Sequence, residues 1–280
     1  MKWIMKRSLW MGLLFLFSAV GCANATERLF TYTYEPETMP QGALEFEQWT
    51  TLRAVRNNHV NKNHYMRWDL RQEIEYGVTD NYTLSFYLNE KSEYFRNPAS
   101  HAKTNDFTFE GVSLENKWMV LDPARNPIGL SLYLEPTIGN SEFELEEKVI
   151  LGQRYGNWKW AFNAVHATEW EDSNEPGKGT ETEGELEFDF GLTYELNSHW
   201  NIGVEFRNHN EFPEYGGQSH TAFFVGPALA YRQEKWWAAF TFLTQVYGDN
   251  KTSPDPDGND DLVLDKHELL NARLIVGVSF

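Results

Sequence analysis

Apolar and polar residues alternate along most of the chain from residue 42 onward. In segment 65–76, apolar side chains recur at nearly every second position, from Met66 and Trp68 to Tyr76, with charged residues between them. Segment 185–196 repeats the pattern. Because successive side chains of a strand point to opposite faces, each segment is predicted to be a strand with one apolar and one charged side.

The connections between these segments alternate in length. Short turns are predicted at 77–81, 122–127, 155–157, 197–199 and 233–235, and longer polar connections at 56–63, 90–106, 139–141, 171–183, 208–219 and 248–266. We therefore predict an all-β fold, a transmembrane antiparallel up-and-down β-barrel of about 12 strands over residues 42–280, since this alternation is typical of bacterial outer-membrane barrels. A secreted soluble β-sandwich also alternates, but it has no reason to place its long loops at one end.

Aromatic residues support the membrane interpretation. Trp118, Trp158, Trp200 and Trp236 each stand near a predicted short turn, where an aromatic girdle at the periplasmic membrane interface is expected. The chain ends in an alternating segment closed by Phe280. A terminal Phe resembles the signal that barrel-assembly machinery recognises in outer-membrane proteins, so that machinery is an expected partner.

The start of the chain is predicted to be a cleaved signal peptide over residues 1–25. Basic residues within 2–7 precede an apolar run at 9–20, and small residues at 23–25 form a cleavage site. Cys22 is either removed with this leader or lipidated as the first mature residue, because the residues before it form a degraded lipoprotein signal. Residues 26–41 would then lie in the periplasm or fold into the lumen as a plug.

Composition alone suggests an acidic soluble protein. The chain of 280 residues has 24 basic and 41 acidic residues, a net charge of −17, and a mean hydropathy of −0.56. Removing the three basic residues of the leader leaves a net charge of −20. Such a charge excludes a phosphate-backbone footprint, so nucleic acid is not an expected partner. In a barrel, the mean hydropathy combines the values of two different surfaces, an apolar belt that faces lipid and a polar lumen. A negative mean is therefore compatible with a membrane protein of this kind.

The predicted lumen face is dense in ionisable groups. Its residues are predicted to include Glu45, Glu47, Arg67, Asp69, Arg71, Glu73, Glu144, Glu146, Lys148, Glu185, Glu187, Asp189, Glu205, Arg207 and Arg273. One interpretation is a ladder of ion pairs that fills the interior. The other is a water-filled path whose excess of carboxylates attracts cations.

No catalytic residue and no cofactor is predicted. Ser219 and His220 are an adjacent pair without a recognisable hydrolase motif around them. The eight histidines show no metal-ligand spacing, and His209 and His220, which flank one predicted loop, are expected to be surface residues. A weak Ca²⁺ candidate is the acidic loop that contains Asp255, Asp257 and Asp261.

Three segments, 42–47, 75–81 and 224–231, resemble a broad group of proteobacterial outer-membrane barrels that includes the phenol-degradation MetA-type barrels. The resemblance implies a pore or transport role in the outer membrane of a Gram-negative bacterium, in contact with lipid and lipopolysaccharide. It implies no catalytic residues and no particular substrate.

The sequence thus predicts a passive channel or facilitator for small solutes with an acidic lumen that favours cations. The alternative is a non-conducting structural or surface-binding barrel with an ion-paired lumen. A third hypothesis, an outer-membrane hydrolase, lacks a motif.

Overall fold

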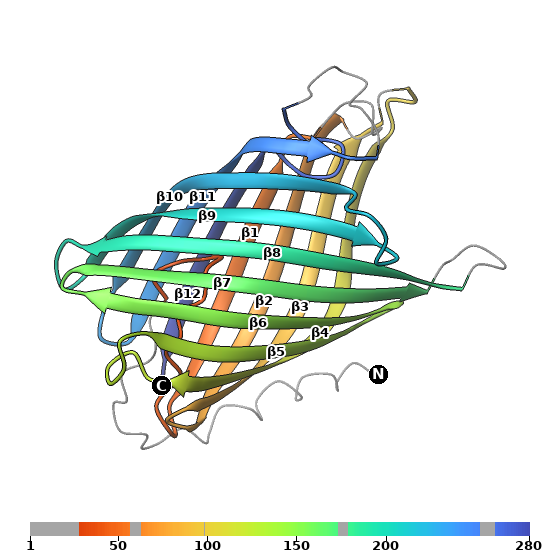
Figure 1. Cartoon of the computed structure of the whole chain (residues 1–280). Helices are drawn as coiled ribbons and strands as arrows, with labels where there is room; N and C mark the ends of the chain where they lie inside the picture. Colours follow the sequence, from red (N-terminus) through yellow and green to blue (C-terminus); the bar gives the residue numbers. More distant parts are fainter. Residues whose placement is uncertain (1–27, 57–62, 98, 173–178, 253–260) are drawn as a thin grey trace, which may run out of the picture.

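Twelve antiparallel strands form a closed barrel in the computed structural model of the chain (Figure 1). The structure describes residues 28–56, 63–97, 99–172, 179–252 and 261–280. The strands are β1 (Leu44–Ala54), β2 (Asn63–Thr79), β3 (Tyr82–Arg96), β4 (Lys103–Leu121), β5 (Gly129–Gly139), β6 (Glu142–Tyr155), β7 (Trp158–Asp172), β8 (Thr180–Glu195), β9 (Trp200–Pro213), β10 (His220–Arg232), β11 (Trp236–Asn250) and β12 (Leu270–Ser279).

Each strand pairs with its neighbours in the chain, and β12 pairs with β1 to close the barrel. In this seam Phe46 stands opposite Val278, and the backbone N–H of Phe280 donates to the carbonyl of Leu44 at 3.0 Å. No helix in the described part of the chain is long and apolar enough to cross a membrane. The predicted all-β barrel of 12 strands is confirmed.

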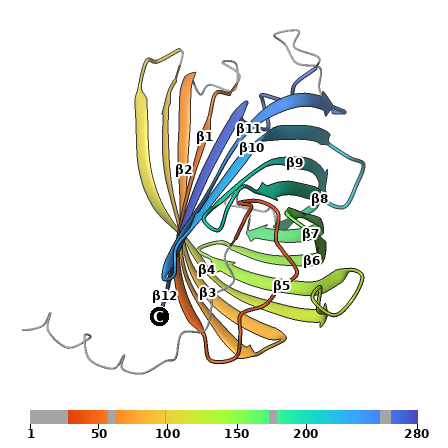
Figure 2. The same ribbon diagram turned by 90° about the vertical axis from the view of Figure 1, so that its left-hand side faces the viewer.

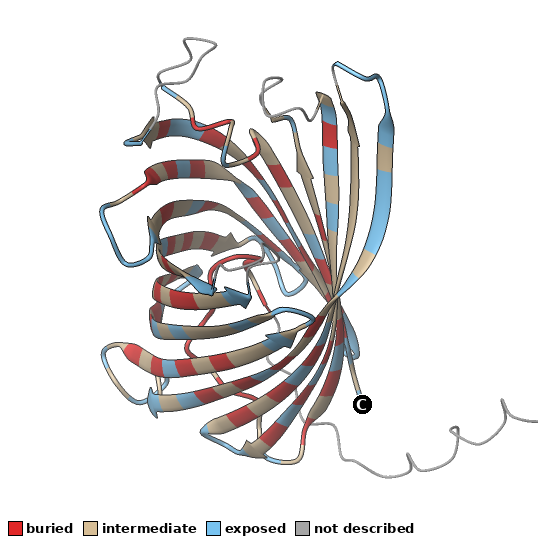
Figure 3. Ribbon diagram, turned by 90° about the vertical axis from the view of Figure 1, so that its right-hand side faces the viewer, coloured by how far each residue is buried: buried red, intermediate tan, exposed pale blue. Residues whose placement is uncertain are grey.

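The alternation of the sequence appears on the strands as stripes of buried and exposed residues (Figure 3). On β2, the outward Ile74 is 52% exposed, whereas its neighbours Glu73 and Glu75 are buried inside the barrel. Outward aromatic residues pair across strands near the short turns: the Trp118 ring stacks on Tyr82 with centroids 5.1 Å apart. The outer surface is therefore an apolar belt, as a barrel in a lipid bilayer requires.

Several strands are longer than the alternating pattern predicted. The connection expected at 90–106 is confined to residues 97–102, because β3 and β4 remain paired as far as Arg96 and Lys103. Likewise, β9 continues to Pro213 through part of the connection expected at 208–219. The prediction was wrong in these bounds because the backbone ladder needs no apolar side chains, so polar residues can extend the strands.

Glu147 is a charged residue on the outer face. The pairing of β6 with β5 and β7 shows no register shift, so Glu147 points outward between Leu145 and Val149, and its side chain is 56% exposed. Its carboxylate lies 3.5 Å from Nδ1 of His166, the residue opposite on β7. This charge therefore has a partner on the neighbouring strand.

The segment of residues 28–41 runs inside the barrel before β1 begins (Figure 2). It passes close to Gly77 at the short-turn end. A Cβ added to Gly77 would lie 2.0 Å from the carbonyl oxygen of Pro40, so only glycine fits there. The N–H of Met39 donates to Oγ1 of Thr83 on β3 at 2.9 Å. We call these residues the lumen segment.

Candidate functional site: the barrel lumen and its two ends

The lumen segment is held by polar side chains of the barrel wall. Glu205 on β9 accepts hydrogen bonds from the backbone N–H groups of Thr31, Tyr32 and Thr33 at 3.0, 3.0 and 2.8 Å. The amide of Asn163 on β7 bonds both the N–H and the carbonyl of Tyr34, at 2.6 and 2.9 Å. Buried backbone groups need such partners, so these two wall residues fix the segment's path.

A small apolar core also lies in the lumen. Tyr34 packs with Trp49 and Tyr133 at centroid distances of 6.3 and 5.2 Å, and Trp237 belongs to the same buried cluster. The ammonium of Lys148 lies 4.2 Å from the centre of the Tyr34 ring, a cation–π contact. The alternating pattern did not predict this core, although Trp49 shares its strand parity with Glu45 and Glu47.

Ion pairs link neighbouring strands across the interior. Arg53 on β1 contacts Asp69 on β2 at 2.6 Å, and Lys91 on β3 contacts Glu110 on β4 at 2.6 Å. Arg207 on β9 also contacts Glu187 on β8, Arg71 on β2 reaches Glu135 on β5, and Lys148 contacts Glu146 on its own strand. The interior is thus partly an ion-paired network.

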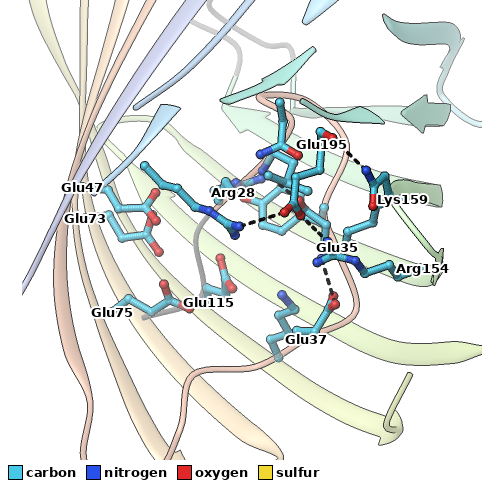
Figure 4. Close-up of a pocket in the computed structure, with 16 residues that line it drawn as sticks. Arg28, Glu35, Glu37, Glu47, Glu73, Glu75, Glu115, Arg154, Lys159 and Glu195 are labelled. Atoms are coloured by element: carbon cyan, nitrogen blue, oxygen red, sulfur yellow. Dashed lines mark hydrogen bonds and ion pairs between the residues drawn. The ribbon is translucent and has the colours of Figure 1, made fainter. Parts of the chain in front are cut away.

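Near the short turns, carboxylates gather around a cavity of about 210 Å³ (Figure 4). Glu47, Glu73, Glu75 and Glu115 lie on one side of Arg28, and Glu35 lies on the other. The lining contains seven carboxyl groups and five cationic side chains, so acidic groups outnumber basic ones around the cavity. We call this group the carboxylate cluster.

Two acidic residues of the lumen segment differ in their environment at this cavity. Burial raises the pKa of Glu35 above its ordinary value, although Lys159 and Arg28 oppose the change. Burial acts on Glu37 in the same direction, but its pKa is lowered overall because Lys159 contacts it at 2.8 Å. The ion pair between Glu37 and Lys159 therefore ties the lumen segment to β7.

Three histidines meet at the opposite, long-loop end of the lumen. His209 on β9 and His220 on β10 are buried, and His267 in the connection before β12 is half-buried. Nε2 of His220 lies 2.7 Å from Nε2 of His267, and the ring centroids of His209 and His267 are 4.6 Å apart. The prediction of surface histidines at 209 and 220 was wrong, because the strand register turns both inward and the connection covers them.

Carboxylate and hydroxyl groups surround this histidine cluster. Glu187, opposite His209 in the pairing of β8 with β9, contacts its Nδ1 at 3.1 Å. Oγ of Ser219 contacts Nδ1 of His220 at 3.1 Å. Burial is the main cause that lowers the pKa of His267 well below its ordinary value, and the neighbouring imidazoles act in the same direction. That imidazole is therefore neutral at pH 7.

The pair of Ser219 and His220 has hydrogen-bond geometry, but both side chains are buried. The ring of His220 also belongs to the histidine cluster, so the pair borders that cluster.

The residues predicted to line the lumen differ in their burial. Five are buried: Glu45, Glu47, Glu73, Asp189 and Glu205. Ten have intermediate exposure: Arg67, Asp69, Arg71, Glu144, Glu146, Lys148, Glu185, Glu187, Arg207 and Arg273. Their access to water remains a prediction, since the lumen segment lies over part of this face.

Other predicted sites lie on the surface or outside the described residues. Trp118, Trp158, Trp200 and Trp236 are exposed beside the short turns, and their membrane-interface role remains a prediction. Phe280 is exposed after β12. Of the Ca²⁺ candidates, Asp255 and Asp257 lie outside the described residues, as do the predicted leader and Cys22, while Asp261 is exposed.

A family model matches residues 22–280, which include the whole chain after the predicted leader of residues 1–25. The chain belongs to DUF6662. This is a family of unknown function. No curated protein matches the chain. The resemblance to outer-membrane barrels is supported, while the narrower MetA-type group remains a prediction.

Several solved structures share the fold. The COG4313 outer membrane channel from Pseudomonas putida F1 aligns with a TM-score of 0.60 at 11% identity, covering 87% of this chain and 97% of its own. The NanC porin aligns with a TM-score of 0.50 at 10% identity, covering 84% and 98%. The translocator domain of the autotransporter NalP from Neisseria meningitidis aligns with a TM-score of 0.50 at 10% identity, covering 86% and 89%. This likeness concerns the fold, which is that of outer-membrane β-barrels.

Proposed function

We propose that this DUF6662 protein is a passive channel for small solutes in the outer membrane of a Gram-negative bacterium, with an acidic lumen that favours cations. The observation that carries the proposal is the cavity among the carboxylates Glu47, Glu73, Glu75 and Glu115. An excess of carboxylates in a low-dielectric wall raises the local concentration of cations. The small solute itself is not specified by this chemistry.

The lumen segment acts in this proposal as a narrowing element. It enters from the short-turn end and is bonded to Glu205 and Asn163 at mid-lumen. Removing it would leave an interior lined by the wall alone.

We further propose that the barrel-assembly machinery inserts the chain into the outer membrane, with Phe280 as part of the signal that this machinery recognises. We also propose that MetA-type barrels are relatives of this chain.

The second candidate function is a non-conducting structural or surface-binding barrel. The aromatic core of Tyr34, Trp49 and Tyr133 with its overlying Lys148 favours it, because this core fills lumen space that a wide pore would leave open. The two candidates differ in one measurable property, the passage of ions.

Conductance in planar bilayers tests the proposal. The wild-type chain is compared with a variant that lacks residues 28–36 and keeps the leader. We expect a small cation-selective conductance from the wild type, and a larger one from the deletion because the narrowing element is gone. If both proteins insert and neither conducts, the channel proposal is wrong and the non-conducting barrel is favoured.

The charge of the cavity is tested separately. The triple variant Glu47→Gln, Glu73→Gln and Glu75→Gln should lower the permeability ratio of K⁺ to Cl⁻ toward one, because it removes three carboxylates facing the cavity. Glu147→Gln is the matched control, since Glu147 lies on the outer face. Unchanged selectivity of the triple variant would show that ions do not pass this cluster.

A further inference from the structure

Three elements far apart in the sequence bring imidazoles together at the long-loop end. His209 is on β9, His220 begins β10, and His267 follows a turn in which its N–H donates to the carbonyl of Val263 at 3.0 Å. One nitrogen from each histidine lies within 4.8 Å of the other two. The convergence depends on the fold, since no motif in the sequence links these positions.

The far side of two imidazoles is already occupied by orienting groups. Glu187 contacts Nδ1 of His209, and Ser219 contacts Nδ1 of His220, each at 3.1 Å. Nε2 of both rings is therefore the nitrogen left for a shared ligand. Histidines that bind metals commonly donate their other N–H to a carboxylate, which fixes the ring and raises its basicity.

A fourth ligand group stands next to the imidazoles. Oε2 of Glu211 lies 3.1 Å from Nε2 of His220, the residue opposite it in the pairing of β9 with β10. On another side, the ring of Phe224 meets His267 edge-on, with centroids 5.9 Å apart. A set of three imidazoles and one carboxylate, beside an apolar ring, offers the ligands that Zn²⁺ takes in tetrahedral sites.

We propose that His209, His220 and His267 bind a divalent transition-metal ion, with Zn²⁺ as the representative ion and Glu211 as the fourth ligand. Imidazole nitrogen selects such ions over Mg²⁺ and Ca²⁺, which prefer oxygen ligands. The site is independent of the channel proposal, because a conducting or a non-conducting barrel could carry it.

The site requires one small movement. Two nitrogens on a tetrahedral Zn²⁺ stand roughly 3.3 Å apart, given Zn–N bonds of about 2.0–2.1 Å, whereas Nε2 of His220 and Nε2 of His267 are 2.7 Å apart. His267 belongs to a connection and not to a strand, so it is the ring that can shift. Bound metal would then tie the connection between β11 and β12 to β9 and β10 at the outer mouth.

Equilibrium dialysis of the refolded full chain, made without a polyhistidine tag and freed of metal by a chelator, tests the proposal. We expect one Zn²⁺ per wild-type chain, retained in the presence of excess Mg²⁺ and Ca²⁺. His267→Ala should weaken this binding more than about 100-fold, because losing a ligand exceeds the effect of losing an orienting group. His166→Ala is the matched control and should bind as the wild type does, since His166 lies on the outer face.

Failure of the wild type to bind Zn²⁺, or equal binding by His267→Ala, overturns the proposal. Heat-modifiable migration on gels shows whether each variant is folded. A second measurement needs no variant: Zn²⁺ should shift the imidazole ¹⁵N resonances of three histidines in the wild type and leave His166 unchanged. Shifts confined to other histidines would also overturn the proposal and leave the short His220–His267 contact as a hydrogen bond.

Discussion

The two ends of the lumen use the same acidic residue type in different ways. At the short-turn end, Glu47, Glu73 and Glu75 face one another and a cavity, with Arg28 close by. At the long-loop end, Glu187 stands behind the ring of His209 and bonds its Nδ1. The first arrangement concentrates negative charge toward a space, and the second directs imidazole nitrogens toward one point.

Strand parity alone therefore does not define the chemistry of this barrel's interior. Every one of these residues points inward because of the period of two along its strand. The partner that lies opposite decides the outcome: another carboxylate at one end and an imidazole at the other. The lumen segment lines the cavity at the short-turn end with Arg28 and Glu35.

The largest expected effect comes from releasing that segment. Glu205→Ala leaves the buried N–H groups of Thr31, Tyr32 and Thr33 without their acceptor, each at a cost of roughly 1–3 kcal/mol. The lower end of this range, about 3 kcal/mol for the three groups, corresponds to about a 100-fold increase in the population of molecules whose lumen segment has left its site. Chymotrypsin, which cuts after aromatic residues, should then cleave the segment in the folded barrel about 100-fold faster.

Thr241→Val is the control for Glu205→Ala. It removes only the hydroxyl that Thr241 donates to Glu205 and leaves the backbone bonds in place. Its cleavage should rise far less. Equal cleavage of wild type and Glu205→Ala would mean that the segment is held chiefly by other contacts.

An intermediate effect is expected at the histidine end. Glu187→Gln keeps the size of the side chain but removes the charge that orients His209, so Zn²⁺ affinity should fall about tenfold. Glu146→Gln, an interior carboxylate paired with Lys148, is the control and should leave Zn²⁺ binding unchanged. Dialysis measures both. If Glu187→Gln binds Zn²⁺ as tightly as the wild type, Glu187 does not orient His209, and the carboxylates at the two ends do not differ in the way described.

The smallest effect is expected from the ion pair of Glu37 with Lys159. Both side chains are partly exposed, at 31% and 16%, so Lys159→Met should weaken the hold on the segment by about 1 kcal/mol or less. In the same chymotrypsin assay, cleavage should increase less than about tenfold. A larger increase than that of Glu205→Ala would show that charge, and not backbone hydrogen bonding, holds the segment.

Much of the fold could be predicted because period-two alternation is a local property. The alternating pattern predicts that Tyr76 lies on the outer side of β2 and Glu75 on the inner side. In the structure, Tyr76 is exposed and Glu75 is buried. Strand ends such as Arg96 could not be predicted, because backbone pairing continues where the apolar pattern stops.

Less of the candidate site than of the fold could be predicted from the sequence. Inward carboxylates such as Glu45 and Glu47 followed from parity, but their burial depends on what packs over them, including the contacts of Trp49 and Trp237. His209 and His220 are eleven positions apart on either side of a predicted connection, which suggested a surface loop. Their meeting with His267 requires the closed barrel to bring the connection before β12 against β9 and β10.

The sequence by itself determined the barrel, the approximate number of strands and the acidic character of the inward face, because these depend on side-chain alternation along single strands. Only the tertiary structure decided what occupies the lumen and which inward groups meet. Residues 28–41 carry no alternating pattern, and their path depends on acceptors such as Glu205, more than 170 positions away. Contacts over such separations arise from closure of the barrel, which no local pattern encodes.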